Sequence, residues 1–294
     1  MSLANQAAET AYRVLDKCTR ELQPDGPWRW RCVLQNGARL PLSASIGEGF
    51  LELACHPEAM RGDAGTLERA LLGNGALPGG ARLALNAASR DLHLRADIAL
   101  LDEAQLLDRL QWALHGFHEG HRLLRALDSK GGCVARPATT ARETSVGEML
   151  RGTSWTFTER GLNDCAAQLD ADSAAPARVA MIENDLVFST ELVRCAARTA
   201  RKSLALFLLT ASGALRLARA YAVQAESEWS FGFQVCLPSA PAAEEIDHAM
   251  AALSFAHRIC ARESNVLLDE AAARSYLAAR DFATNHQPQE EMES

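Results

Sequence analysis

Two apolar periods alternate along this chain: a period of two, typical of half-buried strands, and a period of three to four, typical of amphipathic helices. The clearest strand pattern covers residues 92–100, where apolar and polar side chains alternate. Asp102 follows as an N-cap residue for a helix from Glu103 to about Leu127. An aromatic version of the same pattern covers residues 229–237, and Pro241 suits the first turn of the next helix.

The same reading extends over the whole first part of the chain. We expect a helix to open it and another to close it, with five strands and a short helix between them. In order, the predicted elements are a helix over residues 4–21, strands over 28–34, 40–46 and 50–55, a helix over 65–72, strands over 82–88 and 92–100, and a helix over 103–127.

The second part repeats this order. Its first element, within residues 146–160, reads as a helix, although a strand around Trp155 is an alternative. The later predicted elements are strands over residues 165–169, 178–183 and 186–192, a helix over 196–209, strands over 217–224 and 229–237, a helix striped from Ile246 to Cys260, and a helical segment over 267–280.

A weak internal repeat supports two tandem domains. The run from Leu71 to Leu77, ending Gly-Ala-Leu, returns as the run from Leu208 to Leu215. A repeat period of more than a hundred residues indicates two similar domains and not a solenoid of short units. We therefore predict an α+β fold in which two domains of α-β-β-β-α-β-β-α order each pack an antiparallel sheet with helices. The expected boundaries are 1–128 for the first domain, 129–144 for a linker, 145–282 for the second domain and 283–294 for a polar tail.

Composition narrows the function classes. The net charge of −7 argues against a nucleic-acid partner, because such proteins usually carry a basic face. The longest apolar runs are too short to span a membrane, and the first residues lack the basic-then-apolar form of a signal peptide. The eight cysteines form neither a CxxC pair nor a zinc spacing, so free thiols in a reducing compartment are expected. We expect a cytoplasmic protein.

Catalytic signals are weak. Nucleophile-elbow, zinc-protease and phosphate-loop motifs do not occur in the sequence. His115, His118 and Glu119 gather on one predicted helix, and His115 and His118 could share a face. A metal site would need a third ligand from elsewhere, so the commoner reading is a solvated helix face. We therefore expect a protein that is not an enzyme and that binds neither a cofactor nor a metal. The alternative is a metal-binding enzyme that uses these histidines.

Aromatic residues are the stronger hint. They concentrate on the predicted strands, where they form either the core or an apolar sheet surface left open for an extended guest. Together with two positions on the apolar stripe of the first helix, they are the candidate partner contacts. These candidates are Tyr12, Leu15, Trp28, Trp30, Trp229, Phe231 and Phe233.

The order of elements resembles class I type III secretion chaperones. The resemblance covers roughly residues 4–127 and 145–268, and its most similar parts are residues 91–100 and 229–235, each with its following helix. It implies an acidic, cytoplasmic, non-enzymatic protein, linked to virulence, that holds part of an effector in an extended state. Those chaperones usually dimerise. Here two units share one polypeptide, so an intramolecular pseudo-dimer in a monomer is expected. The alternative is a structural or regulatory subunit of a larger assembly.

Overall fold

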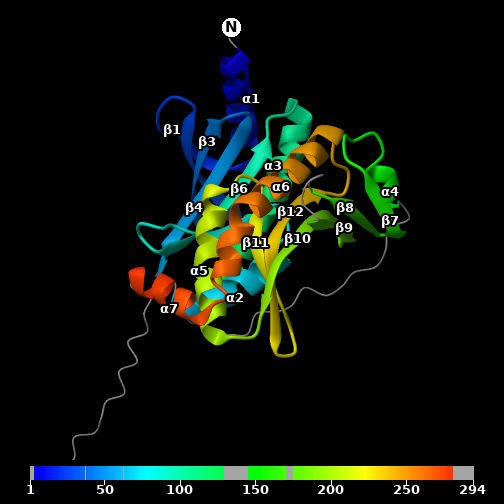
Figure 1. Cartoon of the computed structure of the whole chain (residues 1–294). Helices are drawn as coiled ribbons and strands as arrows, with labels where there is room; N and C mark the ends of the chain where they lie inside the picture. The colour runs from blue at the N-terminus through cyan, green and yellow to red at the C-terminus, as the bar shows by residue number, and fades with distance from the viewer. Residues whose placement is uncertain (1–2, 37, 62, 129–144, 170–174, 281–294) are drawn as a thin grey trace, which may run out of the picture.

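The computed structural model describes residues 3–36, 38–61, 63–128, 145–169 and 175–280. The predicted linker at 129–144 and the predicted polar tail at 283–294 lie outside the described residues. The fold is α+β, with two six-stranded antiparallel sheets packed by helices, which confirms the predicted fold class (Figure 1).

The first half of the chain, residues 3–128, contains three helices and six strands. Its elements are α1 (Leu3–Cys18), β1 (Arg20–Pro24), β2 (Arg29–Asn36), β3 (Ala38–Gly47), β4 (Phe50–Arg61), α2 (Ala64–Ala76), β5 (Arg82–Leu85), β6 (Asp91–Ala99) and α3 (Glu103–Asp128).

The second half, described from residue 145 to 280, repeats that series and adds one helix. Its elements are α4 (Val146–Met149), β7 (Phe157–Gly161), β8 (Asp164–Gln168), β9 (Pro176–Ile182), β10 (Asp185–Cys195), α5 (Arg198–Ala214), β11 (Arg219–Ala225), β12 (Glu228–Pro238), α6 (Ala243–Val266) and α7 (Glu270–Ala279).

The two sheets have the same topology. The strand orders are β1-β2-β3-β4-β6-β5 and β7-β8-β9-β10-β12-β11, which match strand for strand. Even the turn after the third strand is shared, because Glu48 and Glu183 both adopt positive φ there. The internal repeat seen in the sequence therefore corresponds to a repeated three-dimensional arrangement.

Each half has one strand that the leading interpretation of the sequence did not include, and in the second half a strand around Trp155 was the alternative. The expected helix over residues 4–21 ends at Cys18, and β1 follows it. Within residues 146–160 the helix is a single turn, and β7 occupies the place where a continuing helix was expected. Both missed strands lie at sheet edges and are largely exposed, so they lack the apolar alternation that marks a half-buried strand.

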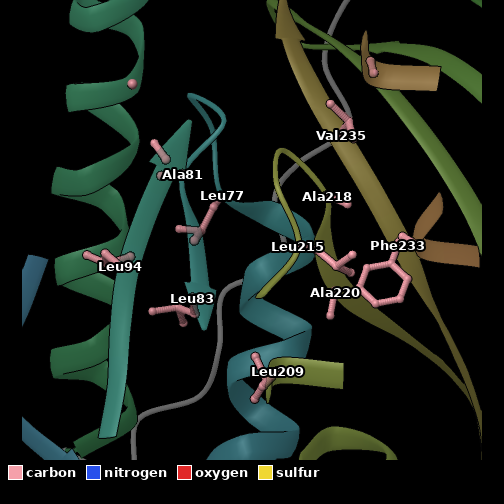
Figure 2. Close-up of a cluster of buried hydrophobic side chains, with 14 of the residues drawn as sticks. Leu77, Ala81, Leu83, Leu94, Leu209, Leu215, Ala218, Ala220, Phe233 and Val235 are labelled. Atoms are coloured by element: carbon pink, nitrogen blue, oxygen red, sulfur yellow. The ribbon is translucent and has the colours of Figure 1, made fainter. Parts of the chain in front are cut away.

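The two halves meet because each packs one of its helices on a strand of the other. Helix α2 of the first half packs on β11 of the second, and α5 packs on β5, while α2 and α5 also contact each other. Figure 2 shows the apolar side chains at this junction, with Leu83 and Leu94 on one side and Ala220 and Phe233 on the other. All four are buried. The arrangement has approximate two-fold character, as each half offers the same elements to the other.

Two buried arginines mark equivalent positions in this interface. Arg82 opens β5 and Arg219 opens β11, and both side chains are almost completely buried. Arg82 donates to the carbonyl oxygens of Ser212 at 3.0 Å and Leu215 at 2.9 Å in the other half. Arg219 donates at 3.0 Å to the carbonyl oxygen of Ala81. Each arginine thus satisfies backbone acceptors that the other half would otherwise bury without partners.

Among the described residues, the carboxylate that balances Arg82 has no counterpart in an ion pair with Arg219. Asp97 lies 2.8 Å from the Arg82 guanidinium, and the strand pairing places Cys236 at the equivalent position of β12. Arg219 donates to the Cys236 sulfur at 2.9 Å. The halves share a backbone plan but have diverged in the chemistry of their contact.

Further interface contacts repeat the two-fold pattern. Arg95 on β6 donates to the carbonyl oxygen of Gly213, and Gln234 at the equivalent position of β12 donates to Gly75. Beyond these, Arg109 of α3 forms a two-pronged ion pair with Glu245 of α6, with both nitrogen–oxygen distances at 2.9 Å.

Helices in the described part of the chain are too short or too polar to cross a membrane.

Candidate functional site

An open trough crosses the outer face of the first sheet. It consists of two adjoining hollows of about 400 and 200 Å³ that share Ser43, Ala54 and His56. Helix α3 packs on the opposite side of β6, where Leu94 is in close reach of Gly120. The trough is therefore the face that the helices of its own half leave uncovered.

The strand register places small side chains along the middle of the trough. Antiparallel pairing places Arg31 opposite Ser43, Ser43 opposite Ala54, and Ala54 opposite Arg95. Side chains that pair across neighbouring strands share a face, so these residues form one transverse row. The middle of the row carries a hydroxymethyl and a methyl group, and the long side chains stand at its two ends.

The trough ends at the other half of the molecule. Helix α5 finishes beside β6, where a Cβ on Gly213 would lie 4.0 Å from the His93 ring. Arg95 donates to the Gly213 carbonyl oxygen, and its guanidinium lies 3.6 Å from Glu52. Glu52 also binds Arg216 of the second half at 2.7 Å. This wall exists because the two halves are docked.

Two imidazoles line the end near α5. The rings of His56 and His93 are stacked with centroids 5.1 Å apart. Burial, and then the neighbouring His56, lowers the pKa of His93 to about 4, so its ring is neutral at pH 7. Nδ1 of His93 is buried without a hydrogen-bond partner among the described residues. This end of the trough is therefore bounded by a neutral, buried His93 ring and by the exposed His56 ring.

Charges on the trough are already paired within the protein. Arg31 binds Asp25 at 2.9 Å, Glu21 binds Arg39, and Glu52 binds two arginines. Paired charges and small hydroxyl side chains suit a polar ligand without a strong net charge. The trough covers β1, β2, β3, β4 and β6, a width of about 19 Å at about 4.8 Å per strand. That width matches about six residues of extended chain at about 3.3 Å each.

The equivalent face of the second sheet carries larger side chains. Register places Arg178 where the first sheet has Ser43, and Gly232 where it has His93. Arg178 pairs with Asp164 at 3.1 Å, and the Tyr221 ring lies against Gly232. Burial raises the pKa of Tyr221 to about 12, as expected for a phenol packed into a closed surface. The floor of small side chains is thus a feature of the first half and not of the shared fold.

Most of the candidate contacts predicted from the sequence lie in the core. Leu15, Phe231 and Phe233 are fully buried, and Trp30 and Trp229 are nearly so. The Trp229 ring packs on Phe231 and under the Arg201 guanidinium. These five side chains hold the sheets to their helices, so in this conformation they cannot contact a guest. Tyr12 and Trp28 remain, with 41% and 46% of their surface exposed.

The sheet edges are poor templates for an added strand. The free edges are β1 and β7, each of five residues. Both have an irregular register with their neighbours, between Arg20 and Gln23 and between Glu159 and Gly161, and β1 ends in Pro24. Short, bulged edges discourage pairing with another chain. A guest is better accommodated across the trough than along an edge.

The histidines of α3 do not complete a metal site among the described residues. Groups of three potential ligands are absent from that part of the chain. His115 is exposed and His118 is half-buried, and desolvation followed by the His115 charge lowers the pKa of His118.

A separate hollow between the two halves, lined by Asp97, Trp112 and Cys236 among others, has a volume of about 30 Å³. That is room for about one water.

The sequence analysis did not predict the trough, because the feature that marks it is the small size of its side chains. Ser43, Ser45 and Ala54 occupy outward positions of predicted strands, where polar or small residues are ordinary. Only the register of β3 with β4 brings them together. His93 was visible as a polar position in a clean alternation, and nothing local indicated that the second half would bury it.

Comparisons with known proteins add little. Neither a protein-family model nor a curated protein matches the chain. Among solved structures, one likeness is to DynU16, described as a putative protein in the dynemicin biosynthetic locus. The two are 10% identical, with a TM-score of 0.15 and 96% of each chain covered. A likeness at that score carries no argument about function.

Proposed function

We propose that this protein is a non-enzymatic chaperone or adaptor that holds an extended polar segment of a partner protein in the trough of the first sheet. The open trough is the observation that carries the proposal. The same position in the second half carries the larger side chains of Arg178 and Tyr221, so the fold does not require small residues there. A floor of small side chains in the first half, where the second half has larger ones, is the feature that a bound segment would use.

The size and chemistry of the trough support an extended peptide. A floor of small side chains leaves room for a backbone, and the serine hydroxyls and the exposed His56 ring can exchange hydrogen bonds with it. The resemblance to class I type III secretion chaperones favours a secreted cargo or a component of the secretion apparatus as the partner. We place the protein in the cytoplasm on the same grounds.

The docked halves support a monomer as the working form. The sheet of each half covers one helix of the other, α2 on β11 and α5 on β5, as two subunits would in a dimer. Light scattering at micromolar concentration should therefore give a mass near 31.8 kDa. A mass twice that value would show that a second copy is needed.

A peptide selection tests the trough. Random peptides of about seven residues, long enough to span it at about 3.3 Å per residue, would be displayed and selected on the full-length protein. Selected peptides should lose at least about tenfold in affinity, or about 1.4 kcal/mol, on Ser43→Arg, which copies the larger side chain at this position of the second sheet. Arg178→Ser is the matched control and should leave affinity unchanged.

Three results would contradict the proposal. Peptides could bind the Ser43→Arg variant as well as the parent, which would place their site elsewhere. Selection could yield no binding peptide at all. A selected peptide could be chemically altered during incubation, which would indicate an enzyme. Thermal unfolding of both variants controls for folding, because Ser43 and Arg178 are exposed and their substitution should change stability little.

A further inference from the structure

Helix α6 presents an apolar stripe to solvent. Phe255, Ile259 and Val266 each keep 48% of their surface exposed. Their spacing of four and seven residues places them along one side of the helix. The buried side of α6 is a separate stripe containing Met250, Leu253 and others, packed on β10 and β12. The helix is therefore apolar on two sides, although only one packs against the sheet.

The matching helix of the first half serves as an internal comparison. Buried positions of α3 and α6 align with a constant offset, as in Leu110 with Met250 and Gly120 with Cys260. Under the same offset, Phe255 corresponds to His115 and Ile259 to Glu119. Both helices hold the same place in the same fold. Packing of the domain therefore does not explain why one outer side is polar and the other apolar.

In the first half, helix α1 covers the beginning of α3 and stops short of the positions that match the stripe. The sixteen-residue helix α1 packs along α3, with Arg13 and Lys17 bound to Glu103 and Cys18 hydrogen-bonded to Gln111. In the second half the corresponding helix, α4, is one turn long and packs on β7, β8 and β9. Gln111 corresponds to Ala251, one turn before Phe255. The apolar stripe begins where the coverage by a first helix would end.

Charge specifies the chemistry of an incoming helix. The exposed Arg258 lies beside the stripe, 5.7 Å from the centre of the Phe255 ring, and the exposed Arg262 lies along it between Ile259 and Val266. Glu263, the carboxylate next to Arg262, is half-buried, and its charge acts on Tyr276 of α7. Carboxylates among the described residues form no ion pair with either guanidinium within 4 Å. In a protein of net charge −7, two such arginines beside an apolar stripe favour an acidic partner.

We propose that the outer side of α6 docks an amphipathic helix of a partner protein, with apolar side chains at three- and four-residue spacing and acidic residues beside them. Helices bind helices and grooves through such anchors. This site is separate from the trough and does not depend on the function proposed for it. With both sites occupied, the protein would contact a partner at an extended segment and at a helix.

Designed peptides provide the probe. Three fluorescent peptides of about eighteen residues, or about five helical turns, would carry the same leucine stripe with acidic, neutral or basic flanking residues. Fluorescence anisotropy with the full-length protein should rank them acidic, then neutral, then basic. We expect at least about a tenfold difference between the extremes, or about 1.4 kcal/mol, and it should shrink as salt is added.

Substitutions locate the site. Ile259→Glu should weaken the acidic peptide at least about tenfold, consistent with loss of a central anchor and added repulsion. Glu119→Gln, at the matched position of α3, should leave binding unchanged, and so should Ser43→Arg in the trough. Ile259 is half-exposed, so the variant should unfold at nearly the parent temperature, which verifies that its loss of binding is local.

Four results would overturn the proposal. Equal affinity for the acidic and basic peptides would show unspecific apolar adsorption. Full binding to the Ile259→Glu variant would place the site elsewhere. A dimer that Ile259→Glu dissociates would identify a second copy as the occupant. Binding that appears only after removal of residues 281–294 would identify the chain's own end as the occupant.

Discussion

The ion pair between Arg82 and Asp97 gives the most direct test of the interface between the halves. The two side chains have exposures of 0% and 1% and lie 2.8 Å apart. Burial lowers the pKa of the Arg82 guanidinium, and the Asp97 carboxylate opposes that change most strongly. Asp97→Asn keeps the shape of the side chain and removes its charge. It leaves a cation inside the protein with carbonyl partners alone.

The expected cost follows from those contacts. Removing one partner of a buried ion pair typically costs about 3 to 5 kcal/mol. Here Arg82 keeps its bonds to two carbonyl oxygens, and the amide oxygen introduced by Asp97→Asn can still accept the bond that Leu217 N donates to Asp97 at 2.7 Å. We therefore expect the lower end, about 3 kcal/mol. At about 2–4 °C per kcal/mol, the unfolding temperature should fall by about 6–12 °C.

Urea titration and calorimetry at pH 7 would measure this loss on the full chain. Asp102→Asn is the matched control, because Asp102 is exposed and asparagine caps a helix about as well as aspartate. A stability loss below about 1 kcal/mol for Asp97→Asn, the range of an exposed pair, would contradict this account. The carboxylate would then not be what compensates Arg82.

Three further outcomes are expected. Gly79→Ala should lower the free energy of unfolding by at least about 3 kcal/mol, because φ is +75° and the new Cβ would lie 2.3 Å from the Trp112 carbonyl oxygen. Gly49→Ala, at φ +83° in open space, is the control and should lower it by about 1 kcal/mol in the same denaturation assay. His93 has a folded pKa of about 4, below its ordinary value of 6.5, so the unfolded state binds the proton more tightly. Its contribution, up to about 3 kcal/mol, should be complete above pH 6.5 and lost as pH falls toward 4, and His93→Gln should flatten that part of the stability profile. Asn74→Leu should cost about 2 to 3 kcal/mol on urea unfolding, because the buried Asn74 amide bonds both Leu83 and Ala220 and the leucine would leave their backbone groups unpaired; a neutral result would show that water replaces it.

Elements whose pattern is decided by one buried face could be predicted from the chain. β6 and β12 each have one face against helices of their own half, and α3 and α6 show long apolar stripes with N-terminal signals, so their positions agree within a few residues. β1 was missed, and β7 was foreseen only as the alternative strand around Trp155, for the converse reason. An edge strand with both faces exposed is held by its neighbour's backbone, and its side chains carry no period that reveals it.

The candidate site depended on information that no local pattern contains. The aromatic residues chosen from the sequence lie mostly in the core, because a large apolar side chain on a strand is equally suited to a core and to a binding surface. The trough arises from small residues on different strands, brought together by register and closed by a helix from the other half. Arg82, Asn74 and Asp97 likewise read as ordinary polar positions until the docking of the halves buries them.

Patterns within the chain were enough to establish the α+β class, the repeated order of elements and the two similar halves, because these follow from short-range periodicity and from similarity between distant segments. Three-dimensional packing was needed to settle which polar residues are buried, which sheet face stays open and which helix face stays uncovered. Those outcomes depend on contacts between residues more than a hundred positions apart, such as Arg82 with Ser212 and Asn74 with Ala220. Contacts of that kind leave no periodic trace in the chain, since each partner satisfies its local pattern whether or not the other is present.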